Sequence, residues 1–379
     1  MNAGAVYLDH CATSPLRPEA RTAMSAAFDV TGNPSSVHAD GRAARALLEE
    51  ARARVALLAG AAPAAVTFTS GGTEANVLAI RSAVAAGARR LLISAIEHDC
   101  IREAALASGV ETIEVPVRPE GMIDLEILQS LLDARPSDSG PVFLALMAAN
   151  NETGVIQPTR EAGERVRAAG GWLHVDAVQA AGRIPAGLDL LGADSLALSA
   201  HKLGGPQGIG ALVAGARTRI VRDMPGGGQE HGRRAGTQNL IGAAGFGAAA
   251  EAALASSRIG PEARDAAAAV LSRAGAVVVG AGAPRLDDVL CIAAPDLPSE
   301  TQVMGLDLAG VRVSAGAACS SGKVRPSRVL EAMGLGDVAG CAIRLSGGWS
   351  TRPEDWRIAA EIWIDLKTRR DSRRHPAAA

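Results

Sequence analysis

The chain of 379 residues is 48% hydrophobic and 21% charged, a composition typical of a folded globular protein with room for a large domain and a smaller one. A formal net charge of −2 gives no electrostatic argument for nucleic acid or a membrane as a partner. The first residues lack the basic start and apolar core of a signal peptide, and the apolar stretch 241–256 is too short to span a membrane.

The cysteines, at positions 11, 100, 291, 319 and 341, show no metal-ligand spacing, so no metal site is expected. Their odd number leaves one thiol unpaired in any disulfide scheme. Reduced thiols in a cytoplasmic protein are the simplest expectation.

Residues 7–15 predict a short strand or extended arm that ends at a proline, and residues 42–59 have the apolar spacing of a helix. From residue 66 onward, strands and helices alternate. The predicted strands are 66–70, 90–94, 112–117, 142–147, 172–175, 195–199 and 209–214, and the predicted helices are 73–86, 99–107, 125–134 and 160–169. This alternation predicts an α/β fold with a mostly parallel sheet covered by helices on both faces.

Past about residue 257 the pattern changes to that of a compact α+β second domain. Helices are predicted at 262–274, 300–307, 326–333 and 353–367, and strands at 289–293, 311–314 and 343–346. The basic run 369–375 is expected to be a frayed, solvated end.

Lys202 follows an apolar strand in a chain with only three lysines. Arginine supplies positive charge elsewhere, so a lysine here suggests chemistry that needs an amine able to lose its proton, such as Schiff-base formation. An ordinary surface lysine is the alternative. Asp176, at the end of another strand, favours the first interpretation, because pyridoxal 5′-phosphate (PLP) needs an acid for its pyridine nitrogen and a lysine for its aldehyde.

Further polar residues follow the ends of predicted strands, where the ligands of α/β sheets bind. They are Gly72 and Thr73 in Thr-Ser-Gly-Gly-Thr-Glu at 69–74, His98, Asn151 in Asn-Asn-Glu-Thr-Gly at 150–154, Gln179, Ser199 and His201. The first motif can cradle a phosphate at a helix N-terminus or serve only as an N-cap. The histidine can stack on a flat cofactor or cap a helix, and the Asn-rich segment can bind a ligand or form a turn.

Three segments of the second half add chemistry. The glycine-rich stretch 226–237 is either a linker or a source of Arg and Thr side chains for a phosphate. Arg344 lies inside an apolar strand, where a buried charge needs a carboxylate partner, either structural or from a substrate. Cys319 lies among small residues, which indicates an exposed thiol; Lys323 and Arg325 favour its thiolate. The other cysteines are interpreted as core or incidental, although Cys11 and Cys100 adjoin site segments.

Together these segments resemble the cysteine desulfurases of the NifS/IscS type, class V PLP enzymes of fold type I. The resemblance covers nearly the whole chain. It rests on the order of Tyr-Leu-Asp-x-x-Ala-Thr at 7–13, Gly-Asn-Pro-Ser-Ser at 32–36, the motifs at 69–74, 97–98 and 150–154, His-Val-Asp-Ala-x-Gln at 174–179, Ser-x-His-Lys at 199–202, Arg-x-Gly-Thr at 234–237 and the Cys319 loop. Cys11 and Ala317 depart from the usual residues of the family, without removing a reacting group.

The resemblance implies a large PLP-binding domain at 16–257, with a mostly parallel seven-stranded sheet, and a small α+β domain at 1–15 and 258–379 that carries the catalytic cysteine. It also implies residue roles. Lys202 would hold PLP and act as base, Asp176 would pair with the ring nitrogen, Gln179 would bind the phenolic oxygen, and His98 would stack on the ring and assist proton transfers. The phosphate would be held by Gly72, Thr73, Ser199 and His201, with Thr237 of a second subunit. Arg344 would bind the substrate carboxylate with Asn33 and Asn151 nearby, and Asn151 would also lie at the cofactor.

The implied reaction converts L-cysteine to alanine and leaves the sulfur as a persulfide on Cys319, which passes to an acceptor protein for iron–sulfur cluster or thio-cofactor synthesis. A cytoplasmic homodimer is expected. The nearest alternatives are a selenocysteine lyase or an aminotransferase, although an aminotransferase would not need Cys319. A non-catalytic interaction protein is a further alternative, which the full set of reactive residues disfavours.

Overall fold

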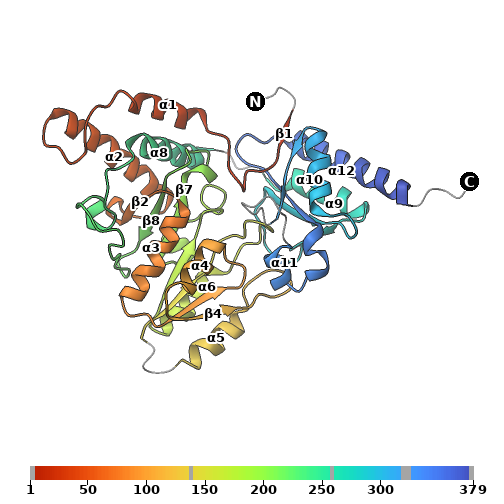
Figure 1. Cartoon of the computed structure of the whole chain (residues 1–379), viewed down its shortest axis with the longest axis horizontal. Helices are drawn as coiled ribbons and strands as arrows, with labels where there is room; N and C mark the ends of the chain where they lie inside the picture. The colour runs from red at the N-terminus through yellow and green to blue at the C-terminus, as the bar shows by residue number, and fades with distance from the viewer. Residues whose placement is uncertain (1–4, 136–139, 257–259, 317–325, 375–379) are drawn as a thin grey trace, which may run out of the picture.

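The computed structural model describes residues 5–135, 140–256, 260–316 and 326–374. Within these residues, seven strands form one sheet in the order β2-β8-β7-β6-β5-β3-β4 (Figure 1). The strands are β2 (Val66–Thr69), β3 (Arg90–Ser94), β4 (Glu111–Val115), β5 (Val142–Ala145), β6 (Trp172–Asp176), β7 (Ser195–Ser199) and β8 (Gly210–Ala214). Among them β8 alone runs antiparallel to its neighbours. The predicted α/β fold with a mostly parallel sheet is therefore confirmed.

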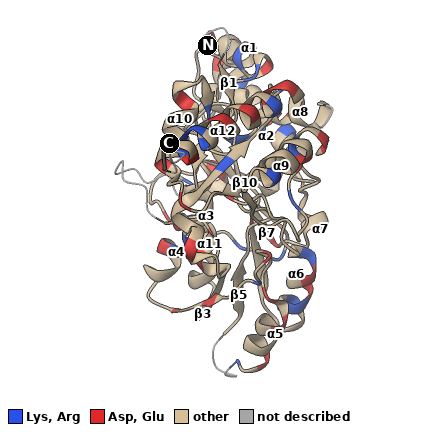
Figure 2. Ribbon diagram, turned by 90° about the vertical axis from the view of Figure 1, so that its right-hand side faces the viewer, with Lys and Arg blue, Asp and Glu red and all other residues tan. Residues whose placement is uncertain are grey.

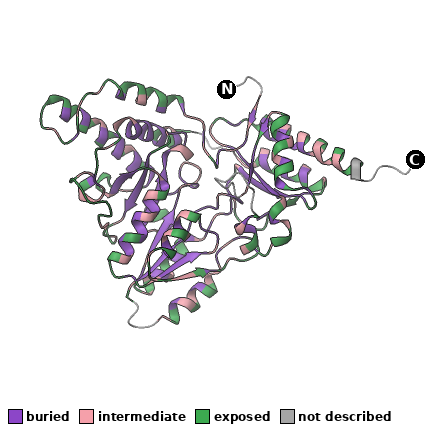
Figure 3. Ribbon diagram, viewed as in Figure 1, coloured by how far each residue is buried: buried purple, intermediate pink, exposed green. Residues whose placement is uncertain are grey.

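Helices cover both faces of this sheet. Side chains alternate between the faces along each strand, so the buried central strands place apolar side chains on both faces. On β5, Phe143 and Ala145 pack with α3 and α4, whereas Leu144 belongs to the core beneath α2, α5, α6 and α8. The bounds are α2 (Ala39–Leu58), α3 (Gly72–Ala85), α4 (Asp99–Leu106), α5 (Leu125–Asp133), α6 (Thr159–Ala168), α7 (Leu188–Leu191) and α8 (Leu240–Ala255). The central strands are buried and the outer helix faces exposed (Figure 3).

The sequence patterns did not predict three helices, the short α7, α1 (Pro18–Ala27) and α8. Helix α8 is apolar on all sides and mostly buried, so it has no amphipathic period to detect. Its glycines let it pack closely on α1 and α2, since a Cβ at Gly247 would lie 2.8 Å from Ala51 Cα and one at Gly245 would lie 2.7 Å from Met24 Cγ.

The second half forms a four-stranded antiparallel sheet in the order β12-β13-β10-β9. Its strands are β9 (Val277–Val278), β10 (Val289–Ala293), β12 (Ser314–Ala315) and β13 (Ala342–Ser346), and its helices are α9 (Glu262–Arg273), α10 (Ser299–Leu308), α11 (Arg328–Ala332) and α12 (Pro353–Arg374). The predicted strand 311–314 is interrupted at Val313. Helix α12 continues past residue 367 to Arg374, so the expectation of a frayed end was wrong for residues 369–374.

The N-terminal segment joins this second half. Strand β1 (Val6–Tyr7) pairs in parallel with β11 (Val311–Arg312), and Leu8 belongs to a core cluster with Trp356 and Trp363. The division of the chain at residues 15 and 257 stays a prediction. In the view of Figure 2 both signs of charge occur along the outer helices. Across the described ranges, every helix is too short or too polar to cross a membrane.

Candidate active site

A cavity of about 1000 Å³ lies between the carboxyl ends of the large sheet and the small sheet. The structure brings ten predicted site residues to its wall, namely Gly72, Thr73, His98, Asn151, Asp176, Gln179, Ser199, His201, Lys202 and Arg344. They come from both halves of the chain. The topology therefore assembles one site from segments that are far apart in sequence, as the strand-end rule predicts.

Lys202 ends a short 3₁₀ helix (Ala200–Lys202) directly after β7. Its Nζ donates hydrogen bonds to the backbone oxygens of Cys11, at 2.5 Å, and Ala12, at 2.8 Å. Burial lowers the pKa of Lys202 to about 8, and the positive charges of Arg344 and Arg183 act in the same direction. The amine is therefore much easier to deprotonate than an exposed lysine, which a nucleophilic or basic role requires.

Asp176 ends β6 and has its two carboxylate oxygens held by different donors. The backbone N–H of Val178 donates to Oδ1 at 2.9 Å, and Asn76 Nδ2 donates to Oδ2 at 2.8 Å. Gln179 Nε2 donates to the Cys11 carbonyl at 3.0 Å. The other amide atom, Oε1, is buried without a hydrogen-bond partner among the residues that the structure describes. It leaves polar capacity for a ligand.

The predicted phosphate-binding residues Gly72 and Thr73 lie at the start of α3. The helix begins at Gly72, and its N-cap residue Gly71 has no side chain, so no side-chain oxygen satisfies the first backbone N–H groups. A second cavity, of about 490 Å³, adjoins this helix start and is lined by Thr73, Ser199 and His201 as well. Burial lowers the pKa of His201 to about 4, so the ring is neutral near pH 7 and can bind as a hydrogen-bonding group.

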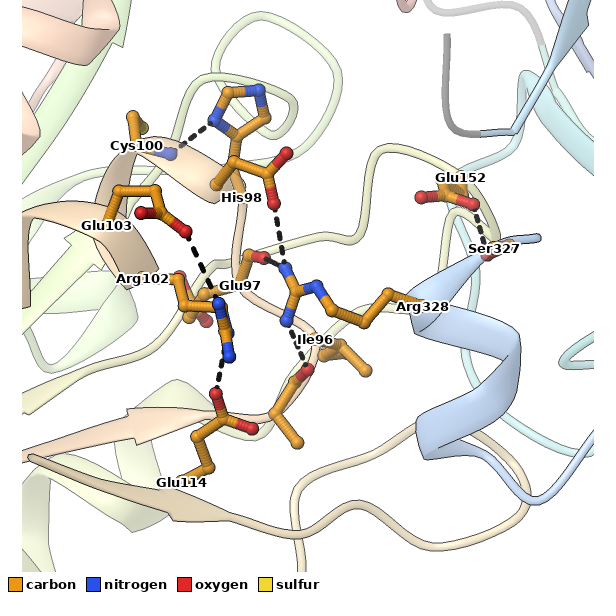
Figure 4. A network of polar contacts seen from close by, with 12 residues as sticks. Ile96, Glu97, His98, Cys100, Arg102, Glu103, Glu114, Glu152, Ser327 and Arg328 are labelled. Atoms are coloured by element: carbon orange, nitrogen blue, oxygen red, sulfur yellow. Dashed lines mark hydrogen bonds and ion pairs between the residues drawn. The ribbon is translucent and has the colours of Figure 1, made fainter. Parts of the chain in front are cut away.

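His98 is the N-cap of α4, where its Nδ1 accepts a hydrogen bond from the backbone N–H of Cys100 at 3.1 Å. The predicted alternatives of capping and cofactor stacking are compatible, because the ring is exposed and lines the cavity. Arg328 of α11 fixes this turn from the small-sheet side (Figure 4). It donates to the backbone oxygens of Ala95 and Glu97 at 3.1 and 2.7 Å.

Glu97 is a cavity residue that the sequence analysis missed. It is 1% exposed; its Oε1 accepts a hydrogen bond from the Met147 N–H at 2.7 Å, and its Oε2 has no partner within the described ranges. Burial raises the pKa of Glu97 to about 8, and the negative charge of Asp176 adds to this effect. Its position beside His98 was the only sequence signal, and that gave no indication of burial.

Arg344 reaches the cavity from β13 and is 4% exposed. One guanidinium nitrogen pairs with Asp9 Oδ1 at 2.7 Å, and another donates to the Asn151 backbone oxygen at 2.9 Å. The buried Nε has no partner in the described part of the chain. The carboxylate that the sequence pattern required is therefore supplied within the chain, while one donor stays available to a ligand.

Two described residues of the predicted site, Asn33 and Thr237, are not among those that line this cavity. Asn33 is exposed and accepts a hydrogen bond from the Ser35 N–H at 2.9 Å, and Thr237 is also exposed. Cys319 lies outside the described residues. The roles of all three stay predictions. Cys11 and Cys100, interpreted as core or incidental, both line the cavity. Cys11 also belongs to the main hydrophobic core, and its carbonyl accepts hydrogen bonds from Lys202 and Gln179.

These side chains fit PLP. A deprotonatable lysine, a carboxylate, an unpartnered buried amide oxygen and an open helix N-terminus match its aldehyde, ring nitrogen, polar substituents and phosphate. The fold and the cavity together define a PLP-dependent enzyme of fold type I.

Comparisons with known proteins identify the family. The aminotransferase class-V family matches residues 6–355. A cysteine desulfurase of Cereibacter sphaeroides is 41% identical over 94% of this chain and 92% of its own. The crystal structure of a NifS-like protein from Rickettsia africae superposes with a TM-score of 0.86 at 30% identity over 96% and 99% of the two chains. A structure described as SspA in complex with cysteine gives 0.77 at 25% identity over 90% and 98%. The chain belongs to the class V aminotransferases and, within them, to the cysteine desulfurases.

Proposed function

We propose that this enzyme removes sulfur from L-cysteine, releases alanine and carries the sulfur as a persulfide on Cys319. The observation that carries the proposal is the placement of Lys202 and Asp176 on one cavity with Arg344. An amine, an acid for the cofactor ring and a guanidinium for a carboxylate are the groups that an amino-acid substrate of PLP requires. The structure described as SspA in complex with cysteine supports cysteine as the substrate.

The bound cofactor would supply an electron sink for the substrate carbon. Lys202 would hold it and, once released, take the proton from the substrate Cα, which suits an amine whose pKa burial lowers to about 8. Asp176 would face the ring nitrogen and His98 the ring. Arg344 and Asn151 would orient the substrate carboxylate, because they lie together across the cavity.

Gly72, Thr73, Ser199 and His201 would hold the phosphate at the start of α3. Thr237, from a second subunit, would complete this site in a homodimer, which suits its exposed position. Asn33, which is also exposed, would lie near the substrate carboxylate. The free thiols at 11, 100, 291 and 341 suit a cytoplasmic enzyme.

Cys319 would act as the nucleophile. Its thiolate attacks the substrate sulfur, so that an S–S bond forms as the C–S bond breaks, and the electron pair left on carbon takes up a proton to give alanine. Gly316 and Pro326, the described residues that flank this stretch, both line the cavity. Ser327 beside them donates to the buried carboxylate of Glu152 at 2.6 Å (Figure 4). The persulfide would then pass to an acceptor protein for iron–sulfur or thio-cofactor synthesis.

The purified enzyme with PLP and L-cysteine tests this proposal. Equal amounts of alanine and, with a thiol reductant, sulfide are expected. Alanine formation from selenocysteine but not from cysteine would favour a selenocysteine lyase. Transfer of the amino group to an added keto acid, with no release of sulfide, would favour an aminotransferase.

A further inference from the structure

A continuous hydrogen-bonded chain of buried side chains leads from the interior of the large sheet to Asp176. His174 and Ser195 lie side by side on β6 and β7, where their Cα positions pair in the parallel register. His174 Nδ1 is 2.8 Å from Ser195 Oγ, and its Nε2 is 2.9 Å from Asn76 Oδ1 of α3. Asn76 Nδ2 completes the chain at 2.8 Å from Asp176 Oδ2.

The chemistry of the Asp176 end fixes the direction of this chain. An ionised carboxylate only accepts, so the Asn76 amide nitrogen must face Asp176 and its oxygen must face His174. The His174 Nε2 is then the protonated nitrogen, and Nδ1 accepts from the Ser195 hydroxyl. Burial lowers the pKa of His174 to about 3, which keeps the ring neutral with a single N–H. Every donor in the chain therefore points toward Asp176.

We propose that Ser195, His174 and Asn76 are positioning residues for Asp176: they hold its carboxylate in place and aim it at the ring nitrogen of the cofactor. The inference rests on the proposed function, since it concerns the partner of that nitrogen. The donors are neutral, so they stabilise the negative charge without cancelling it. With Val178 N–H on the other oxygen, both oxygens are anchored and the carboxylate cannot rotate freely.

The charged and titratable groups around Asp176 require such support. Glu97 and Cys100 face it from the β3–α4 side, and Lys202 faces it from the end of β7. Burial raises the pKa of Cys100 to about 12 and that of Glu97 to about 8, so both are mainly neutral at pH 7. When the Lys202 amine is also neutral, the N–H groups of Asn76 and Val178 are the contacts that hold the Asp176 carboxylate in position.

The test compares binding of PLP with binding of its 1-deaza analogue, in which carbon replaces the ring nitrogen. The wild-type enzyme is expected to prefer PLP, and Asn76→Ala should reduce this preference by about tenfold, since a hydrogen bond to a charged group is lost. His174→Phe should cause a smaller reduction and Ser195→Ala the smallest. His174→Gln should restore the preference, because its amide N–H can reach Asn76. Dissociation constants for both compounds measure these effects without reference to activity.

Ser82→Ala is the matched control, because this buried serine of α3 accepts from the Val221 N–H and lies outside the chain of contacts. It should leave the preference unchanged. An Asn76→Ala variant that binds both compounds more weakly by the same factor, or a preference unaffected by Asn76→Ala and Ser195→Ala, overturns the inference alone. A wild-type enzyme that fails to bind PLP overturns the proposed function instead. If His174→Phe does not fold, Ser195→Ala and Asn76→Ala still decide.

Discussion

Asp176 on the large sheet and Arg344 on the small sheet present opposite charges to one cavity, and they are held in different ways. Neutral N–H groups of Val178 and Asn76 hold Asp176, whereas the charge of Asp9 and the Asn151 carbonyl hold Arg344. A carboxylate stabilised by dipoles keeps its full charge for a permanent partner. Under the proposed role of Arg344, a substrate carboxylate would use its unpartnered Nε and share the guanidinium charge with Asp9. This difference suits the proposed roles, with a resident cofactor on the large-sheet side and an exchanging substrate on the small-sheet side.

The largest effect should come from removing the amine on the large-sheet side. Lys202→Ala should abolish covalent retention of PLP after borohydride reduction, as measured by the mass of the intact protein, and should abolish alanine formation. Lys367→Ala, a half-buried lysine of α12 paired with Asp371, is the control and should keep both. Cofactor mass retained in Lys202→Ala would show that another group holds it.

Two variants on the small-sheet side separate the substrate contact from the structural one. Arg344→Gln should raise the KM for cysteine by about 100-fold, because truncating one member of a buried charge pair costs about 2–5 kcal/mol. Asp9→Asn removes the competing acid and should leave this KM unchanged or lower it. Steady-state kinetics on variants with confirmed folding decide the matter. Equal KM increases in both variants would assign Arg344 a structural role.

The lowered pKa of Lys202 predicts a pH dependence for cofactor capture by the apoenzyme. Only the neutral amine attacks an aldehyde, so the rate of covalent capture should rise about tenfold per pH unit below pH 8 and level off above it. Stopped-flow absorbance at a fixed PLP concentration measures the rate. A rate that keeps rising to pH 10 would mean that burial leaves the amine at an ordinary lysine value.

The smallest effect on turnover is expected at Glu97. Glu97→Gln mimics the protonated acid and should change turnover at pH 7 by less than about threefold. Its pKa is raised in the folded state, so the wild type loses stability as pH rises from about 4.5 to about 8. The glutamine in the variant does not titrate, so the variant should become more stable relative to the wild type as the pH rises from about 4.5 to about 8. Urea unfolding at pH 5 and pH 8 tests it; an equal difference at both values would contradict the burial effect.

Strand ends were the predictable part of this molecule. Asp176 and Lys202 could be placed together because the carboxyl ends of parallel strands meet at one edge, and the structure brings both to one cavity. Asn76 could not be assigned to Asp176 from the sequence, because their contact depends on how α3 lies over β6 and β7. The burial of Glu97 could not be predicted either, because its partner is the backbone N–H of Met147, which follows β5. Helix α8 was missed because it is apolar on all sides and shows no helical period.

Sulfur transfer to Cys319 can be followed with labelled substrate. One equivalent of L-cysteine labelled with ³⁵S, added to the PLP-loaded enzyme without reductant, should give one equivalent of alanine and place the label on the peptide that contains Cys319. Cys319→Ala should bind PLP normally yet retain no label, whereas Cys341→Ala should behave as the wild type. Full labelling of Cys319→Ala, or label found at Cys11 or Cys100 instead, would contradict the account.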